Sequence, residues 1–240
     1  MHTLSELRAG NLVGIKRLDL SCGLTEFPNE IFDLADTLEI LNLSGNALSN
    51  LPDDLHRLHK LRVIFCSDNL FGELPAVLGK CTQLEMVGFK ANKIQRVPAA
   101  DLPAKLRWLI LTDNQIAELP DELGSCTRLQ KLMLSGNQLE NLPDLSACIR
   151  LELLRIAANR FTQFPDWIFL LPRLAWLACA GNPCSDVDEA SAMAKHFITQ
   201  IDWRDLELQH PLGEGASGVT YRAKQKLADS ALPVAVKVFK

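Results

Sequence analysis

Three glycines near the C-terminus have the spacing of a nucleotide-binding loop. Gly213, Gly215 and Gly218 form a G-x-G-x-x-G pattern, and Lys237 follows 19 residues after the last glycine. By itself the glycine pattern fits a dinucleotide-binding turn as well as it fits the phosphate loop of another nucleotide-binding fold. The residues on either side of the glycines must decide between these two interpretations.

The flanking sequence favours a strand on each side of a polar loop. A dinucleotide-binding fold needs a helix directly after the third glycine and an acidic residue about 20 positions further on. Here the segment GVTYRAKQ (218–225) is β-branched and aromatic, which predicts a strand. A second predicted strand, VAVKVF (234–239), contains Lys237. The flanks therefore argue against a dinucleotide-binding turn.

A glycine hairpin followed by a strand with the pattern V-A-x-K resembles the N-terminal lobe of the protein kinases. The resemblance implies that backbone amides of the glycine loop close over the phosphates of ATP, and that Lys237 is the catalytic lysine that pairs with the α- and β-phosphates. Thr220 replaces a hydrophobic residue of the family pattern, which weakens the expected apolar contact to the base. The implied ATP-binding residues are Leu212, Gly213, Glu214, Gly215, Ala216, Ser217, Gly218, Thr220, Ala235 and Lys237.

The kinase resemblance covers only residues 206–240, about 35 positions. The glutamate of the following helix, the H-R-D-x-x-x-x-N loop and the D-F-G aspartate that holds Mg²⁺ lie outside this sequence. We therefore expect an antiparallel, incomplete N-terminal lobe whose Mg²⁺ ligands are elsewhere. The 240-residue chain is expected to be inactive by itself, and the parent protein to be a kinase, with serine or threonine the commoner target of soluble kinases.

The preceding part of the chain is an internal repeat. Asparagines recur at intervals of 23, 23, 22, 23, 22 and 23 residues, and an earlier copy, RLDLSCGLTEFP, has Gly23 in the asparagine position. Apolar residues keep fixed places eight, five and three positions before each asparagine and two and five positions after it. The repeating asparagines are Asn46, Asn69, Asn92, Asn114, Asn137, Asn159 and Asn182.

The repeat predicts a coil that stacks on copies of itself. Its L-x-L centre alternates with period two and predicts a short strand, the asparagine can bond backbone groups at the turn, and the proline opens a helical return segment. One coil cannot bury its own leucines, but about eight stacked coils form a continuous core. Residues 12 to 184 resemble the leucine-rich repeats, which implies an α/β solenoid with a curved parallel sheet on its concave side.

The outward positions of the predicted strands indicate a binding surface. Residues six, four and two positions before each asparagine form an apolar band flanked by small polar residues, and contiguous apolar surface of this kind usually marks an interaction site. We expect the occupant to be a protein partner or the kinase domain of the same protein. The predicted contact residues are Ile40, Phe65, Met86, Trp108, Ile110, Met133, Leu153, Arg155 and Trp176.

The repeat also assigns a role to most of the cysteines. Six occupy positions that hold apolar residues in other coils, which predicts small buried groups rather than metal ligands or disulfides. Cys22, in the irregular first coil, is less well defined. The six are Cys66, Cys81, Cys126, Cys148, Cys179 and Cys184.

A helix is predicted after the last repeat, with Ser185 as its N-cap. Its apolar face should cover the open end of the solenoid. The expected organisation is thus a solenoid at 1–184, a capping helix and linker at 185–205 and the kinase-like segment at 206–240. The residues of the apolar face are Ala190, Met193, Ala194, Phe197 and Ile198.

Composition narrows the class of partner. The formal net charge of −4 and the pI of about 5.8 give no electrostatic reason to expect nucleic acid or an anionic membrane. No apolar run is long enough to span a bilayer, and the N-terminus does not have the pattern of a secretory signal, so we expect a cytoplasmic protein.

The leading hypothesis is the N-terminal part of a soluble, bacterial-type leucine-rich-repeat protein kinase. A non-enzymatic scaffold is the alternative, and a ubiquitin-ligase effector is disfavoured by the VAVK strand.

Overall fold

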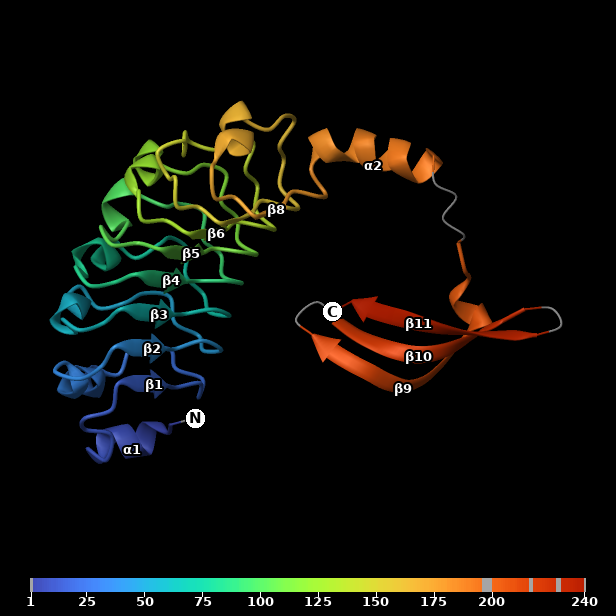
Figure 1. The fold of residues 1–240 in the computed structure, drawn as a ribbon. Helices are drawn as coiled ribbons and strands as arrows, with labels where there is room; N and C mark the ends of the chain where they lie inside the picture. The colour runs from blue at the N-terminus through green and yellow to red at the C-terminus, as the bar shows by residue number, and fades with distance from the viewer. Residues whose placement is uncertain (1, 196–199, 216–217, 228–229, 240) are drawn as a thin grey trace. The chain divides into compact units, whose positions relative to one another are not determined.

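A computed structural model describes residues 2–195, 200–215, 218–227 and 230–239 of the chain. The chain forms two compact units, residues 1–189 and residues 190–240 (Figure 1). The repeats make up the first unit, and the glycine-rich segment lies in the second.

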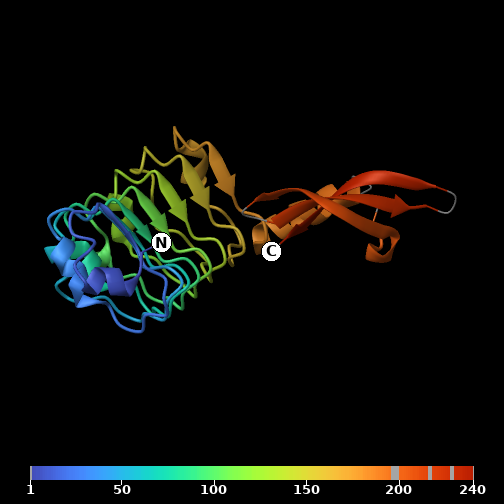
Figure 2. The same ribbon diagram turned by 90° about the horizontal axis from the view of Figure 1, so that it is seen from below.

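Eight short strands of the first unit form one parallel sheet in the order of the sequence (Figures 1 and 2). Each strand pairs with the equivalent residues of the next coil, as Leu109 does with Leu132 and Leu132 with Leu154. The predicted parallel sheet is confirmed. Its strands are β1 (Arg17–Asp19), β2 (Ile40–Asn42), β3 (Val63–Phe65), β4 (Met86–Gly88), β5 (Trp108–Ile110), β6 (Lys131–Met133), β7 (Leu153–Arg155) and β8 (Trp176–Ala178).

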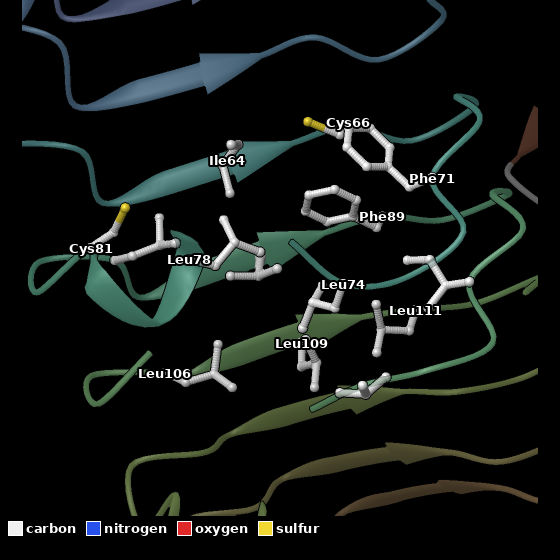
Figure 3. Close-up of a cluster of buried hydrophobic side chains, with 14 of the residues drawn as sticks. Ile64, Cys66, Phe71, Leu74, Leu78, Cys81, Phe89, Leu106, Leu109 and Leu111 are labelled. Atoms are coloured by element: carbon white, nitrogen blue, oxygen red, sulfur yellow. The ribbon is translucent and has the colours of Figure 1, made fainter. Parts of the chain in front are cut away.

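The core of the solenoid is built from one layer of side chains per coil. The middle residue of each strand points inward, and its two neighbours point to the opposite face, as period two requires. Figure 3 shows Leu106, Leu109 and Leu111 of one coil in this interior, where all three are buried. The rings of Phe71 and Phe89 meet edge to face at a centroid distance of 4.9 Å. Each coil therefore buries its apolar residues against its neighbours.

The predicted helical return segments form, but with 3₁₀ geometry. A proline stands directly before most of them, as Pro75 and Pro120 do. A coil of 22 or 23 residues leaves only a few positions between turn and strand, and i→i+3 bonds close a helical turn with fewer residues than an α-helix needs. These helices lie along the outer edge of the curve in Figure 1. They are η1 (Asn29–Leu34), η2 (Leu55–Arg57), η3 (Ala76–Lys80), η4 (Ala99–Asp101), η5 (Asp121–Ser125) and η6 (Asp166–Leu170).

The repeating asparagines bond adjacent coils to each other, as the sequence predicts. The Asn114 Oδ1 accepts the Ile94 N–H at 3.0 Å, and its Nδ2 donates to the Phe89 and Leu111 carbonyls at 2.9 Å each. Asn114 is 8% exposed, so these backbone groups have little access to water. One side chain thus satisfies backbone groups in two coils, which explains why an asparagine recurs at this position.

The N-terminal end of the solenoid is closed by α1 (Leu4–Arg8). Thr3 and Glu6 form a reciprocal capping box at its start, and Leu7 is buried. In the first coil, where Gly23 replaces the asparagine, Asn46 of the second coil reaches back to accept the Cys22 and Leu24 N–H groups at 3.0 Å. The irregular first coil therefore depends on its neighbour for these bonds.

The C-terminal end differs from the prediction. Helix α2 (Pro183–Lys195) forms, but it begins before Ser185, so Ser185 is not its N-cap. Asn182 precedes the helix, and the Ser185 hydroxyl accepts the Asn182 N–H at 3.1 Å. Ala190, expected on the packed face, is exposed, and it lies just beyond the solenoid unit, which ends at residue 189. The side chains of Met193 and Ala194, and residues 197 and 198, lie outside what the structure describes.

A carboxyl group occupies one leucine position of the core. Asp101 stands nine residues after Asn92, where other coils have the buried Leu78 and Leu123 nine residues after their asparagines. It is 3% exposed, and its pKa is raised by burial and by the nearby negative charge of Glu73. The sequence argument did not single out this residue. The repeat offers a signal for it, because a charged residue at a leucine position breaks the pattern.

The second unit is a three-stranded antiparallel sheet with the order β11-β10-β9. The strands are β9 (Leu206–Gly215), β10 (Gly218–Lys226) and β11 (Ala231–Phe239), and the short helix η7 (Trp203–Asp205) precedes them. The antiparallel arrangement expected for this segment is therefore observed.

Candidate functional site

The outward residues of β1 to β8, together with those two positions before each repeating asparagine, are called here the strand face. All nine predicted contact residues lie on it. Most are half-buried, because neighbouring strands lie close enough for their side chains to cover one another. Trp176 is the exception, with 57% of its surface exposed.

The centre of the strand face is apolar and closely packed. A Cβ atom at Gly88 would lie 2.5 Å from Cδ1 of Phe65, so the Phe65 ring covers the glycine of the next strand. Ile40, Met86 and Ile110 are half-buried on the same face. Glycine at position 88 therefore makes room for an aromatic ring, and a larger residue would displace it.

The middle of the strand face contains a cation over an indole ring. The Lys131 Nζ lies 3.8 Å from the centroid of the Trp108 ring, and the two residues are direct neighbours on β6 and β5. The Trp108 Nε1–H is buried without a hydrogen-bond partner, the one side-chain group of this kind among the described residues. An unpaired buried donor costs about 1–3 kcal/mol, so packing of the indole ring outweighs a lost hydrogen bond here.

A second cation and indole ring follow near the end of the sheet. The Arg155 guanidinium carbon lies 5.5 Å from the centroid of the Trp176 ring. Arg155 pairs in register with Met133 on one side and Ala178 on the other. The C-terminal half of the strand face thus presents two cations beside two large aromatic rings.

The N-terminal end of the strand face has its charges paired internally. Arg17 donates to both carboxylate oxygens of Asp19, at 2.7 and 2.8 Å, and Asn42 donates to the same carboxylate at 3.0 Å. The hydrogen bond from Arg17 lowers the pKa of Asp19 to about 2, with a smaller contribution from Asn42. At neutral pH Asp19 is therefore ionised, and its carboxylate accepts the hydrogen bonds from Arg17 and Asn42.

Sequence reasoning placed Lys131 on this face but did not include it among the contact residues. Its relation to Trp108 depends on the register, in which residues 23 positions apart become cross-strand neighbours. The repeat length alone could have predicted this contact, since Lys131 lies 23 residues after Trp108 and the coil between them has that length.

In the second unit the register brings the glycine segment and the lysine strand together. Thr220 of β10 pairs with Gly213 of β9 and with Lys237 of β11, and Arg222 pairs with Ala235. Ala235 and Lys237 are two residues apart and therefore point to the same face of the sheet. The structure thus places Gly213, Thr220, Ala235 and Lys237 in one neighbourhood.

The glycine turn itself is only partly described. Ala216 and Ser217 lie outside the described residues. Gly218 has φ of 147°, a conformation that favours glycine. Leu212 is 57% exposed, and Glu214 is also exposed. The bounds of the turn therefore agree with the glycine pattern, since β9 ends at Gly215 and β10 begins at Gly218.

The cysteines behave mainly as core residues. Cys66, Cys81 and Cys148 are buried, as predicted, and burial raises the pKa of Cys66 well above its usual range and those of Cys81 and Cys148 to about 11. Three others are only half-buried, and Cys22 is exposed. The half-buried thiols are Cys126, Cys179 and Cys184. Cys179 and Cys184 belong to the last coil, so no following coil covers them.

None of the helices in the described part of the chain combines the length and apolarity needed to cross a bilayer. Over the same residues, no three His, Cys, Asp or Glu side chains gather in a group that could hold a metal ion.

Comparisons with known proteins identify the repeats. Residues 104–147 match the family described as leucine rich repeats (2 copies), and residues 37–58 match the family described as leucine rich repeat. Both segments lie in the solenoid. Together with the parallel sheet and the asparagine bonds, they show that the solenoid contains leucine-rich repeats, in agreement with the sequence resemblance.

Individual proteins are similar over parts of the chain. A 77-residue segment is 39% identical to the leucine-rich repeat-containing G-protein coupled receptor 6 of Danio rerio, covering 31% of the chain and 8% of that protein. A leucine-rich repeat protein of Leptospira interrogans has a TM-score of 0.59 at 23% identity, with 82% of this chain and 62% of that one covered. An internalin of Listeria monocytogenes gives 0.58 at 22% identity, with 72% and 50% covered. At these identities the structural likeness concerns the fold alone.

Proposed function

We propose that the solenoid binds a protein partner through the strand face. The observation that carries this proposal is the pair of indole rings of Trp108 and Trp176, set in an apolar band and each beside a cation. Aromatic, Met and Arg side chains are enriched at the centres of protein interfaces. The 57% exposure of Trp176 leaves a large apolar surface available for a partner.

The test is affinity capture on the immobilised 240-residue chain, followed by calorimetric titration of each captured protein. The double variant Trp108→Ala/Trp176→Ala should weaken binding about 1,000-fold, because each interface anchor contributes about 2 kcal/mol. Phe169→Ala/Leu170→Ala is the matched control, since these side chains are 69% and 79% exposed in η6. An unchanged affinity of every captured protein for the tryptophan variant would refute the proposal.

We propose, from a separate observation, that the second unit is the front of a protein-kinase N-terminal lobe. The supporting observation is the register that sets Thr220 between Gly213 and Lys237 and keeps Ala235 on the face of Lys237. A kinase lobe needs this arrangement, because its lysine must reach phosphates held by the glycine turn. The kinase domain of the same protein is then a further possible occupant of the strand face.

The ligand proposed for the glycine turn is ATP. A Cβ atom at Gly213 would meet nothing within 4 Å, so packing among the described residues gives no reason for glycine at this position. A phosphate held against the backbone would give one. Bound ATP would supply the phosphoryl group, with the backbone amides of the glycine turn and Lys237 holding its phosphates. The Mg²⁺ ligands of a kinase are expected beyond Lys237 in the sequence.

The coding sequence after Lys240 tests the kinase proposal directly. We expect H-R-D-x-x-x-x-N and D-F-G motifs at kinase spacing, and a stop codon in their place would leave the non-enzymatic scaffold as the function. In the protein that contains these motifs, Lys237→Met should abolish phosphotransfer to a protein substrate. Lys224→Met, on the exposed surface of β10, should retain it. Phosphotransfer by the Lys237→Met protein would remove the assigned role of Lys237.

A further inference from the structure

The two ends of the strand face differ in how their charges are satisfied. At the N-terminal end, Arg17 and Asp19 neutralise each other through two hydrogen bonds. Along β5 to β8 the outward residues include Lys131 and Arg155 but no carboxylate. At the edges of the sheet, Glu85 and Asp113 are paired with Arg62, Arg107 and Lys90. Glu152, which directly precedes β7, is exposed and lies outside the strand face. The outward residues of β5 to β8 themselves therefore carry positive charge and no negative group.

The two cations lie on aromatic rings and not beside carboxylates. No ion pair among the described residues includes Lys131 or Arg155; instead they lie 3.8 Å and 5.5 Å from the centroids of the Trp108 and Trp176 rings. An ammonium or guanidinium group that has no carboxylate on its own chain can bind one from a partner.

We propose that the partner of the strand face presents an extended acidic segment, in which one carboxylate binds Lys131 and another binds Arg155. This inference rests on the proposed protein-binding function. Lys131 and Arg155 are on adjacent strands and two residues out of register, which separates their backbones by roughly 8 Å. Carboxylates at positions i and i+2 of an extended peptide lie roughly 7 Å apart. Apolar residues of the segment would cover Met133, Leu153 and Trp176.

The small extent of the positive region favours a short acidic peptide over nucleic acid. The formal net charge is −4, so the positive region is local and offers no extended track for a phosphate backbone. A peptide with two carboxylates and flanking apolar side chains matches both the spacing of the cations and the apolar band between them.

The experiment selects peptides on the immobilised 240-residue chain from a displayed library of random 12-residue sequences. We expect enrichment of sequences with Asp or Glu two positions apart next to a large apolar residue. Synthetic copies should bind at least about tenfold more weakly to Lys131→Gln/Arg155→Gln, because hydrogen bonds to charged groups are lost. They should bind normally to Lys93→Gln/Arg96→Gln, which removes the same charge from exposed positions off the strand face.

A charge exchange makes the test independent of misfolding. Lys131→Glu/Arg155→Glu should select peptides with Lys or Arg at the same spacing, and a variant that had lost its fold would select none. If the selected peptides lack acidic residues but still require Trp108 and Trp176, the acidic-segment inference is wrong and the protein-binding proposal stands. If no peptide is enriched, a linear acidic segment is likewise excluded. Selection of phosphorylated peptides over their Asp or Glu copies in a direct competition would also overturn it.

Discussion

The solenoid and the three-stranded sheet bury their apolar side chains to very different extents. In the solenoid the central leucines of successive strands, such as Leu109 and Leu132, are completely buried. In the second unit Ala223 is the one buried hydrophobic side chain among the described residues, and Leu232 remains 51% exposed. Both regions contain strands with alternating apolar residues. The alternation determines which face is apolar, but stacked neighbours determine whether that face is buried.

The largest expected effect comes from truncating the solenoid core. Leu132→Ala should lower the free energy of unfolding by about 3–4 kcal/mol, because the rigid neighbouring coils leave a cavity. Val236→Ala, in the partly exposed sheet, should cost less than about 1 kcal/mol. Urea unfolding followed by circular dichroism measures both. Equal losses at the two positions would contradict the difference in burial between the two units.

Removing an asparagine from the middle of the stack should have the next largest effect. Asn114→Ala leaves the Ile94 N–H without its partner and takes one hydrogen bond from the Phe89 and Leu111 carbonyls. We expect a loss of about 2–3 kcal/mol. Asn46→Ala, where the asparagine is half-buried near the open first coil, should cost less in the same unfolding measurement. A larger loss at position 46 would show that burial does not set the strength of these bonds.

Replacing the buried carboxyl group should stabilise the solenoid. The raised pKa of Asp101 means that the folded protein binds its proton more tightly than the unfolded chain, so stability decreases as pH rises through this range. Asp101→Asn should therefore gain over the wild type as pH increases, with little difference near pH 3 and the full gain at pH 7. Asp101→Leu should add about 1–2 kcal/mol at pH 7.

Unfolding curves from pH 3 to pH 7 measure the difference in the free energy of unfolding between Asp101→Asn and the wild type. Asp53→Asn is the control, because Asp53 is exposed and pays no burial penalty in the fold. A gap for Asp101→Asn that stays constant over the whole range would contradict the role given to the carboxyl group.

The smallest expected effect concerns the turn before an asparagine. Ala158 has φ of 53°, which is strained for a residue with a Cβ atom, whereas Gly136 and Gly181 occupy the equivalent turns of adjacent coils. Ala158→Gly should stabilise the solenoid by about 1 kcal/mol. Ala157→Gly, one residue earlier and without a positive φ, should destabilise it. Thermal unfolding distinguishes the two signs, and a loss at position 158 would contradict the strain.

Much of the solenoid could be predicted from the repeat, because each coil has the same neighbours. The strand residues, the inward leucines and the bonding role of Asn114 all follow from a period that every coil shares. Apart from Cys126, which is half-buried within a regular coil, the misses lie where the period ends or is broken. Ser185 and Ala190 belong to a helix beyond the last coil, and Asp101 breaks the leucine pattern.

The sequence alone was sufficient for the period, the apolar face of each strand and the glycine and lysine positions, since these depend on residues close together in the chain. The tertiary structure decided which groups meet across coils. It set the Lys131 ammonium on Trp108, left the Trp108 N–H without a partner and paired Arg17 with Asp19. Side-chain burial and charge pairing depend on neighbours that only stacking provides. For that reason the strand face could be predicted from the sequence as a surface, whereas its unpaired donors could be identified only from the fold.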